Sequence, residues 1–128
     1  MMLRWQVTES VLLMALILGS CSKPREDSAS TAGEPTTHAG ETIFQTRCFV
    51  CHGREGQGNG PASTGLGAPV RDLTSPSWQD SASDETIRSV IRNGAQAVGG
   101  SAAMTPNRDL SDGQVESLVR YIRTLRRR

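Results

Sequence analysis

Hydrophobic residues in the larger, C-terminal part of the chain recur at helical spacing. In the first such stretch Ile43, Phe44 and Cys48 fall on one helix face, and in the second Ile87 and Ile91 share a face. No run rich in β-branched residues, of the kind that a parallel sheet needs, separates them. The pattern predicts an all-α domain with three main helices, at residues 41–51, 84–93 and 112–125.

Polar residues and glycines mark the ends of the second and third helices. Ser83 stands at the N-cap position of the second helix, and Gly94 follows its last residue. Ser111 and Gln114 have the spacing of a capping box at the start of the last helix. The connections are polar or rich in glycine and small residues, which predicts loops at 53–60, 71–78 and 95–105.

The first 39 residues differ in composition from the rest of the chain. An arginine near the N-terminus and the apolar stretch 11–18 are typical of a signal peptide, and this stretch is too short for a permanent membrane helix. A polar segment follows that has too little apolar surface to fold, with His38 near its end as a residue expected to be exposed. We expect three parts: a signal peptide at 1–20, a flexible linker at 21–39 and one folded domain at 40–128.

Composition narrows the class of protein further. Only 36% of the 128 residues are hydrophobic, which is low for a small domain that has to build its own core. A large apolar cofactor would fill this gap. The net charge is +1, with Lys23 as the single lysine, and no basic stripe interleaved with aromatic residues indicates nucleic-acid binding.

The candidate chemistry lies in the sequence Cys48-Phe49-Val50-Cys51-His52. Two thiols at this spacing can form thioethers with the two vinyl groups of one haem, and the adjacent histidine can bind the iron. A zinc site would need two more soft ligands, and only His38 and Cys21 remain in the chain. A redox-active dithiol is the remaining alternative, although it favours a βαβ context that this sequence lacks.

A second cysteine motif lies at the end of the apolar segment. Leu18-Gly19-Ser20-Cys21 resembles a bacterial lipoprotein signal. The resemblance implies cleavage before Cys21 and a lipid on its sulfur, and this would leave no unpaired thiol in the exported chain. An ordinary secretory signal with a chance cysteine is the alternative.

Met104 is the candidate for a second axial ligand of the iron. Cleavage at the predicted site would leave it as the one methionine of the mature chain. It lies in a loop of small residues before the last helix, with Pro106 restricting the backbone. The alternative is a methionine that fills space in the core.

Residues from about 40 to 125 resemble a bacterial class I cytochrome c. Gly40 and Phe44 match the small and aromatic positions of that family's first helix, and Leu118 and Tyr121 match the positions of the last helix that pack against them. The resemblance implies the cytochrome c fold, with three main helices around one covalently attached haem c.

The resemblance also suggests roles for individual residues of the site. Met104 matches the axial methionine, and Pro61 matches a proline whose carbonyl holds the other nitrogen of the axial histidine. Arg71 and Trp78 lie where relatives offer donors to the haem propionates. Thr105 replaces the proline that often follows the methionine, and the ring of lysines around the haem edge is missing.

These patterns predict a membrane-tethered mono-haem cytochrome c that carries single electrons and is not an enzyme. Its expected partners are extracytoplasmic redox proteins, such as a respiratory complex, an oxidase or a dehydrogenase. Its expected location is the periplasmic or extracytoplasmic face of a membrane, where the lipid anchor would hold it. The alternative function is a haem-based sensor or a small-ligand-binding cytochrome with a labile sixth ligand.

Overall fold

The structure, a computed structural model, describes residues 35–127. This part of the chain is all-α and contains no strand. The predicted signal peptide, Cys21 and most of the predicted linker lie outside the described residues. The helical elements are α1 (Thr37–Ile43), the π-helical η1 (Phe44–Cys48), α2 (Phe49–His52), α3 (Pro76–Ser81), α4 (Asp84–Asn93), the 3-10 helix η2 (Ala95–Val98) and α5 (Asp112–Thr124).

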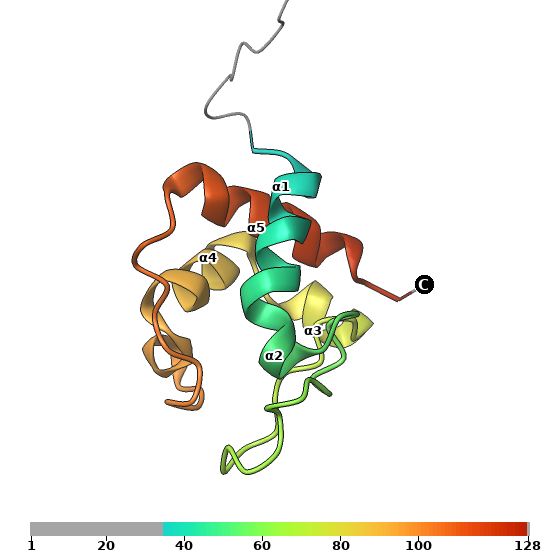
Figure 1. Cartoon of the computed structure of the whole chain (residues 1–128), viewed down its shortest axis with the longest axis vertical. Helices are drawn as coiled ribbons and strands as arrows, with labels where there is room; N and C mark the ends of the chain where they lie inside the picture. Colours follow the sequence, from blue (N-terminus) through green and yellow to red (C-terminus); the bar gives the residue numbers. More distant parts are fainter. Residues whose placement is uncertain (1–34, 128) are drawn as a thin grey trace, which may run out of the picture. The chain divides into compact units, whose positions relative to one another are not determined.

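The elements α1, η1 and α2 form one uninterrupted helical stretch (Figure 1). It begins at Thr37, four residues before the predicted start, because the Thr36 hydroxyl accepts a hydrogen bond from the Ala39 amide at 3.1 Å and caps the first turn. The first three residues of this helix, 37–39, therefore lie in the segment that was predicted as linker. His38 is exposed as predicted, but it belongs to α1.

Helices α4 and α5 confirm the sequence pattern. Ser83 accepts a hydrogen bond from the Thr86 amide at the start of α4, and Gly94 ends that helix with a φ of 81°. Ser111 and Gln114 form the predicted reciprocal capping box of α5. The capping signals therefore fix the ends of these two helices, as the sequence indicated.

Helix α3 was not predicted, since residues 71–78 were expected to form a loop. The helix has no apolar stripe that a periodicity could reveal. Pro76 occupies its first turn, where a missing N–H costs nothing, and Gln79 is its buried residue. The Gln79 amide nitrogen donates to the carbonyls of Leu73 and Ile122, at 2.7 and 2.8 Å. The buried, hydrogen-bonding side chain of Gln79, together with the half-buried Trp78, attaches this helix to the core.

Helices α1 and α5 cross at close range (Figure 1). A Cβ atom at Gly40 would overlap the backbone carbonyl of Ser117, so only glycine permits this approach. One turn further on, the rings of Phe44 and Tyr121 pack at 5.3 Å between centroids and an angle of 55°. The predicted pairing of the first and last helices is confirmed.

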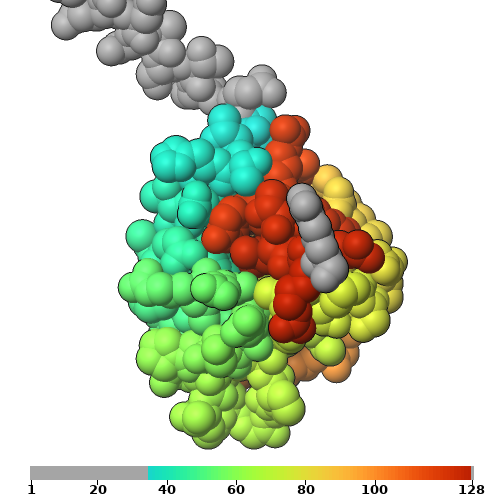
Figure 2. All heavy atoms as spheres, turned by 90° about the vertical axis from the view of Figure 1, so that its right-hand side faces the viewer, coloured from blue at the N-terminus to red at the C-terminus, as the bar shows by residue number. Residues whose placement is uncertain are grey.

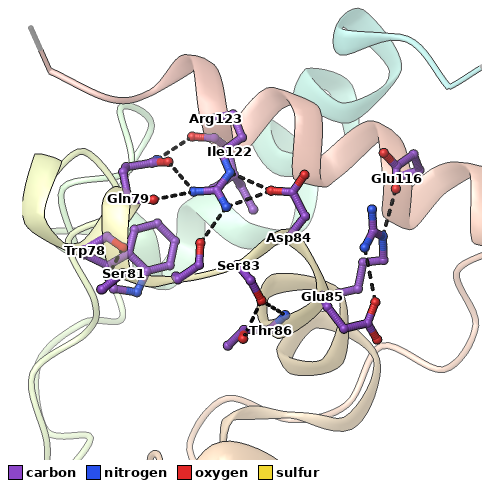
Figure 3. Close-up of polar contacts among 12 residues, drawn as sticks. Trp78, Gln79, Ser81, Ser83, Asp84, Glu85, Thr86, Glu116, Ile122 and Arg123 are labelled. Atoms are coloured by element: carbon purple, nitrogen blue, oxygen red, sulfur yellow. Dashed lines mark hydrogen bonds and ion pairs between the residues drawn. The ribbon is translucent and has the colours of Figure 1, made fainter.

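Arg123 of α5 joins three helices at one point (Figure 3). Its guanidinium bonds to the Asp84 carboxylate at 2.7 Å, to the backbone carbonyl and side chain of Gln79 at 2.7 and 2.9 Å, and to the Ala82 carbonyl. This network holds α3 and α4 against α5 beside the hydrophobic core. The core residues are Phe44, Leu73, Ala82, Ile87, Ile91, Leu110, Val115, Leu118, Val119, Tyr121 and Ile122. Within residues 35–127 no helix is long and apolar enough to span a bilayer.

Candidate functional site

The Cys48–His52 motif lies where η1 passes into α2, so successive helical turns present its three reactive side chains. Cys48 and Cys51 are half-buried free thiols. Burial raises the pKa of Cys48 to about 11, against a smaller lowering by Arg47, so this thiol is protonated at neutral pH. Burial lowers the pKa of His52, which favours the neutral imidazole that binds metal ions.

The orientation of the His52 ring is set by a backbone carbonyl. Its Nδ1 lies 3.2 Å from the carbonyl oxygen of Arg71. In the tautomer with the proton on Nδ1, this nitrogen donates to Arg71 and leaves the Nε2 lone pair free for a metal ion. The contact that the sequence assigned to Pro61 therefore belongs to Arg71, and Pro61 itself is exposed.

A glycine loop explains why residue 71 rather than residue 61 reaches the histidine. The amides of Gly58 and Gly60 donate to the carbonyls of His52 and Cys51, at 2.7 and 3.0 Å. A Cβ at Gly60 would collide with the backbone of α2. The loop is thus folded tightly on the C-terminal end of α2, and a later segment supplies the carbonyl for the imidazole.

A cavity of about 740 Å³ lies next to this segment, between residues 66–72 and residues 99–101. Its volume falls in the range of about 300–1,000 Å³ that cofactor sites occupy. One wall includes Arg71, the partner of His52, and the other belongs to the loop that leads to Met104. Cys48, Cys51, His52 and Met104 do not line this cavity, so the fit to a haem c rests on the two free thiols and on the imidazole with its Nδ1 engaged.

The loop around Met104 is attached to the end of α4. The Met104 carbonyl accepts a hydrogen bond from the Ala95 amide at 3.1 Å, and the side chain is half-buried. The backbone and side-chain N–H groups of Asn107 both donate to the Ile91 carbonyl, at 3.0 and 3.1 Å. A Cβ at Gly94 would also collide with the Met104 carbonyl. These contacts hold a loop without regular structure in one place.

Of the two remaining predicted residues, Arg71 precedes α3 and Trp78 lies within it. The Arg71 side chain is exposed and forms no ion pair within residues 35–127. Trp78 is half-buried and packs against the core. The sequence missed the backbone role of Arg71, because a carbonyl contact leaves no mark in the residue type. It also missed Asp72, although an Asp two residues before Thr74 is a recognisable turn signal.

Residues 35–122 match the family described as cytochrome c oxidase, cbb3-type, subunit III. The chain belongs to this cytochrome c family. This membership, together with the cysteine spacing, identifies an electron-transfer haem protein with covalently bound haem c. The all-α cytochrome c fold that the sequence predicted is confirmed.

Solved structures also resemble this cytochrome. The KustC0563 c-type cytochrome is 28% identical with a TM-score of 0.55, and the match covers 69% of this chain and 98% of that protein. A chain of the Kuenenia stuttgartiensis reducing HAO-like protein complex Kustc0457/Kustc0458 is 26% identical with a TM-score of 0.57. That match covers 71% of this chain but only 43% of the other. Among curated protein sequences, none matches this cytochrome significantly.

Proposed function

We propose that this cytochrome carries single electrons between redox proteins through one haem c, with His52 and Met104 as axial ligands. The observation that carries the proposal is the Cys48–His52 motif, which offers two free thiols and an imidazole whose Nδ1 is engaged by the Arg71 carbonyl. A cavity lies between the segment that holds His52 and the loop that leads to Met104, although neither His52 nor Met104 lines it.

Each residue of the site has a separate task in this proposal. Cys48 and Cys51 hold the haem through thioethers, and Arg71 fixes the imidazole of His52 through its carbonyl. The haem iron, when bound, supplies reversible one-electron chemistry, and a methionine sulfur as ligand raises its potential. Met104 closes the sixth position and so excludes small ligands such as O₂. Ligands that stay in place during the redox change keep the structural rearrangement small.

Arg71 and Trp78 are proposed as donors to the haem propionates. The Arg71 side chain borders the cavity and forms no ion pair in the described part of the chain, so its guanidinium is available to a carboxylate. Trp78 offers an indole N–H from the first turns of α3.

The partners proposed are a respiratory complex, an oxidase or a dehydrogenase, and the chain itself acts as a carrier and not as an enzyme. Two comparisons support redox protein partners. The matched family is named for an oxidase subunit, and one similar structure belongs to a complex of two named proteins.

We further propose that residues 1–20 are removed and that a lipid on Cys21 anchors the protein to the extracytoplasmic face of a membrane. The residues between Cys21 and Thr37 span at most about 50 Å when extended. The Cys21→Ala variant should move from the membrane fraction to the soluble exported fraction. A free, unmodified N-terminus at Ser22, at Lys23 or before Cys21 in the wild-type protein would exclude the anchor.

The function is tested on the purified holoprotein. Haem should stay with the polypeptide in acid acetone, at one haem per chain. A potentiometric titration should follow a single one-electron curve, and the oxidised protein should show the weak far-red band of sulfur-ligated ferric haem. Release of the haem into acetone, or rapid binding of carbon monoxide to the reduced wild-type protein, would replace the carrier with a different class of haem protein, such as a sensor.

A further inference from the structure

The segment that carries the Arg71 carbonyl is held from one side by the glycine loop. The Leu73 amide donates to the Gly56 carbonyl at 2.7 Å. A Cβ at Gly58 would collide with the carbonyl of Val70, so the two backbones are in contact at this point. The buried side chain of Leu73 adds to this attachment.

The C-terminal end of the chain also holds this segment, and Figure 2 shows the end of α5 against the residues that precede α3. The Arg127 amide donates to the Thr74 carbonyl at 3.0 Å, and its guanidinium donates to Asp72 Oδ2 at 2.8 Å. The other oxygen of Asp72 accepts from the Thr74 amide and hydroxyl, at 2.9 and 2.6 Å. We call Asp72, Thr74 and Arg127 the C-terminal latch.

We propose that Asp72 and Arg127 are positioning residues for the axial histidine. Asp72 directly follows Arg71 in the chain, so a latch that fixes Asp72 also fixes the carbonyl that binds His52 Nδ1. This inference rests on the proposed role of His52 as an iron ligand. It assigns to the last residues of the chain an effect on the haem, although none of them lines the cavity.

The latch acts on the potential through the strength of one hydrogen bond. A carbonyl that accepts the Nδ1 proton makes the imidazole a stronger electron donor, which favours ferric iron. Without the latch, the Arg71 carbonyl samples positions further from His52 and this bond weakens. The potential should therefore rise, and the Nδ1 proton should exchange faster with solvent.

Arg126 provides a matched control for Arg127. The two side chains are 46% and 54% exposed, and each pairs with one aspartate at 2.8 Å. Arg126 bonds to Asp80 on α3, whereas Arg127 bonds to the segment next to Arg71. Arg126→Gln and Arg127→Gln therefore remove equal charge and a similar ion pair, but only Arg127→Gln opens the latch.

The experiment compares both variants of the holoprotein with the wild type by hydrogen exchange, proton NMR and redox titration. In Arg127→Gln the Leu73 amide should exchange about five-fold faster, as expected for loss of one ion pair. The resonance of the Nδ1 proton should broaden or shift, and the potential should lie above that of Arg126→Gln. Arg127→Lys should restore part of each change. In a cycle with Asp72→Asn, the second substitution should add little to the first.

The inference is wrong if the two glutamine variants have the same potential and the same Nδ1 resonance. Faster exchange at Leu73 with an unchanged potential and resonance would reduce the latch to a structural role and overturn the proposal as well. Failure of the axial-ligand assignment gives a different result, because the wild-type spectrum would then lack the signature of histidine and methionine ligands. The exchange at Leu73 reports on the latch in either case.

Discussion

Gly40 of α1 and Ser117 of α5 meet with no side chain between them. A Cβ at Gly40 would overlap the Ser117 carbonyl, and Gly40 is buried within α1. The two helices cross at this point, so their separation depends on one missing methyl group. The Phe44–Tyr121 pair and the start of the haem motif lie further along the same helical stretch.

Gly40→Ala should destabilise the protein, although alanine favours helices by about 1 kcal/mol over glycine. The forced separation of the helices should outweigh this gain, with a net loss of about 1–3 kcal/mol. Urea unfolding of the holoprotein measures the change, and Glu41→Ala on the exposed side of α1 is the control. A more stable Gly40→Ala protein would mean that propensity prevails and that the helices do not meet at this residue.

Phe44→Ala should remove a fully buried ring at the helix crossing, at a cost of about 3–5 kcal/mol. This is a large share of the roughly 5–15 kcal/mol that stabilises a small domain, so the yield of holoprotein should fall sharply. Phe49→Ala is a suitable control, because Phe49 is only half-buried and stacks under the Arg54 guanidinium. Equal losses for the two variants would contradict the packing described here.

Arg123→Gln should lower the free energy of unfolding by about 2 kcal/mol, because it leaves the carbonyls of Gln79 and Ala82 without their donor. Arg120→Gln removes the same charge from the same helix. Arg120 is half exposed and lies 3.7 Å from Glu116, so its loss should cost about 0.5 kcal/mol or less. If chemical denaturation gave the same midpoint for both variants, the Arg123 network would contribute no more than an ordinary surface pair.

The parts of this protein that the sequence predicted are those with a local signal. Ser83, Gly94 and the Ser111–Gln114 box mark helix ends by contacts within four residues, and the structure confirms them. Phe44 and Tyr121 were found through a resemblance, since nothing local pairs residues so far apart in the chain.

The parts that were missed depend on non-local contacts. Helix α3 is attached through Gln79, whose partners come from a loop and from α5. The carbonyl that holds His52 belongs to Arg71 because the glycine loop folds back on α2 and leaves Pro61 at the surface. A backbone acceptor carries no residue preference, so only the path of the chain in three dimensions identifies it.

The C-terminal latch should make stability depend on pH through Asp72. The hydrogen bond from the Thr74 hydroxyl, with help from Arg127, holds the pKa of this carboxyl below its usual value. The folded protein therefore takes up the proton at lower pH than the unfolded chain. The stabilisation is present above the usual pKa of about 4 and is lost as the pH falls through the lower, folded value.

Asp72→Asn should therefore be less stable than the wild type at neutral pH, and the gap should narrow as the pH falls below about 4. Thermal unfolding at a series of pH values measures this gap. Glu55→Gln makes the same change in net charge at an exposed position and serves as the control. A gap that stayed constant from neutral to acidic pH would show that the Asp72 carboxylate has no special partner in the folded state.

The central claim, a closed electron-transfer site with Met104 on the iron, is tested most directly by carbon monoxide binding to the reduced protein. The wild-type protein should resist carbon monoxide at neutral pH, because the methionine sulfur occupies the sixth position. Met104→Ala should bind it rapidly, lose the far-red band of the ferric state and have a lower potential. Met104→His should keep the site closed at a lower potential. Rapid, tight binding by the wild-type protein would contradict the account and indicate an open haem site.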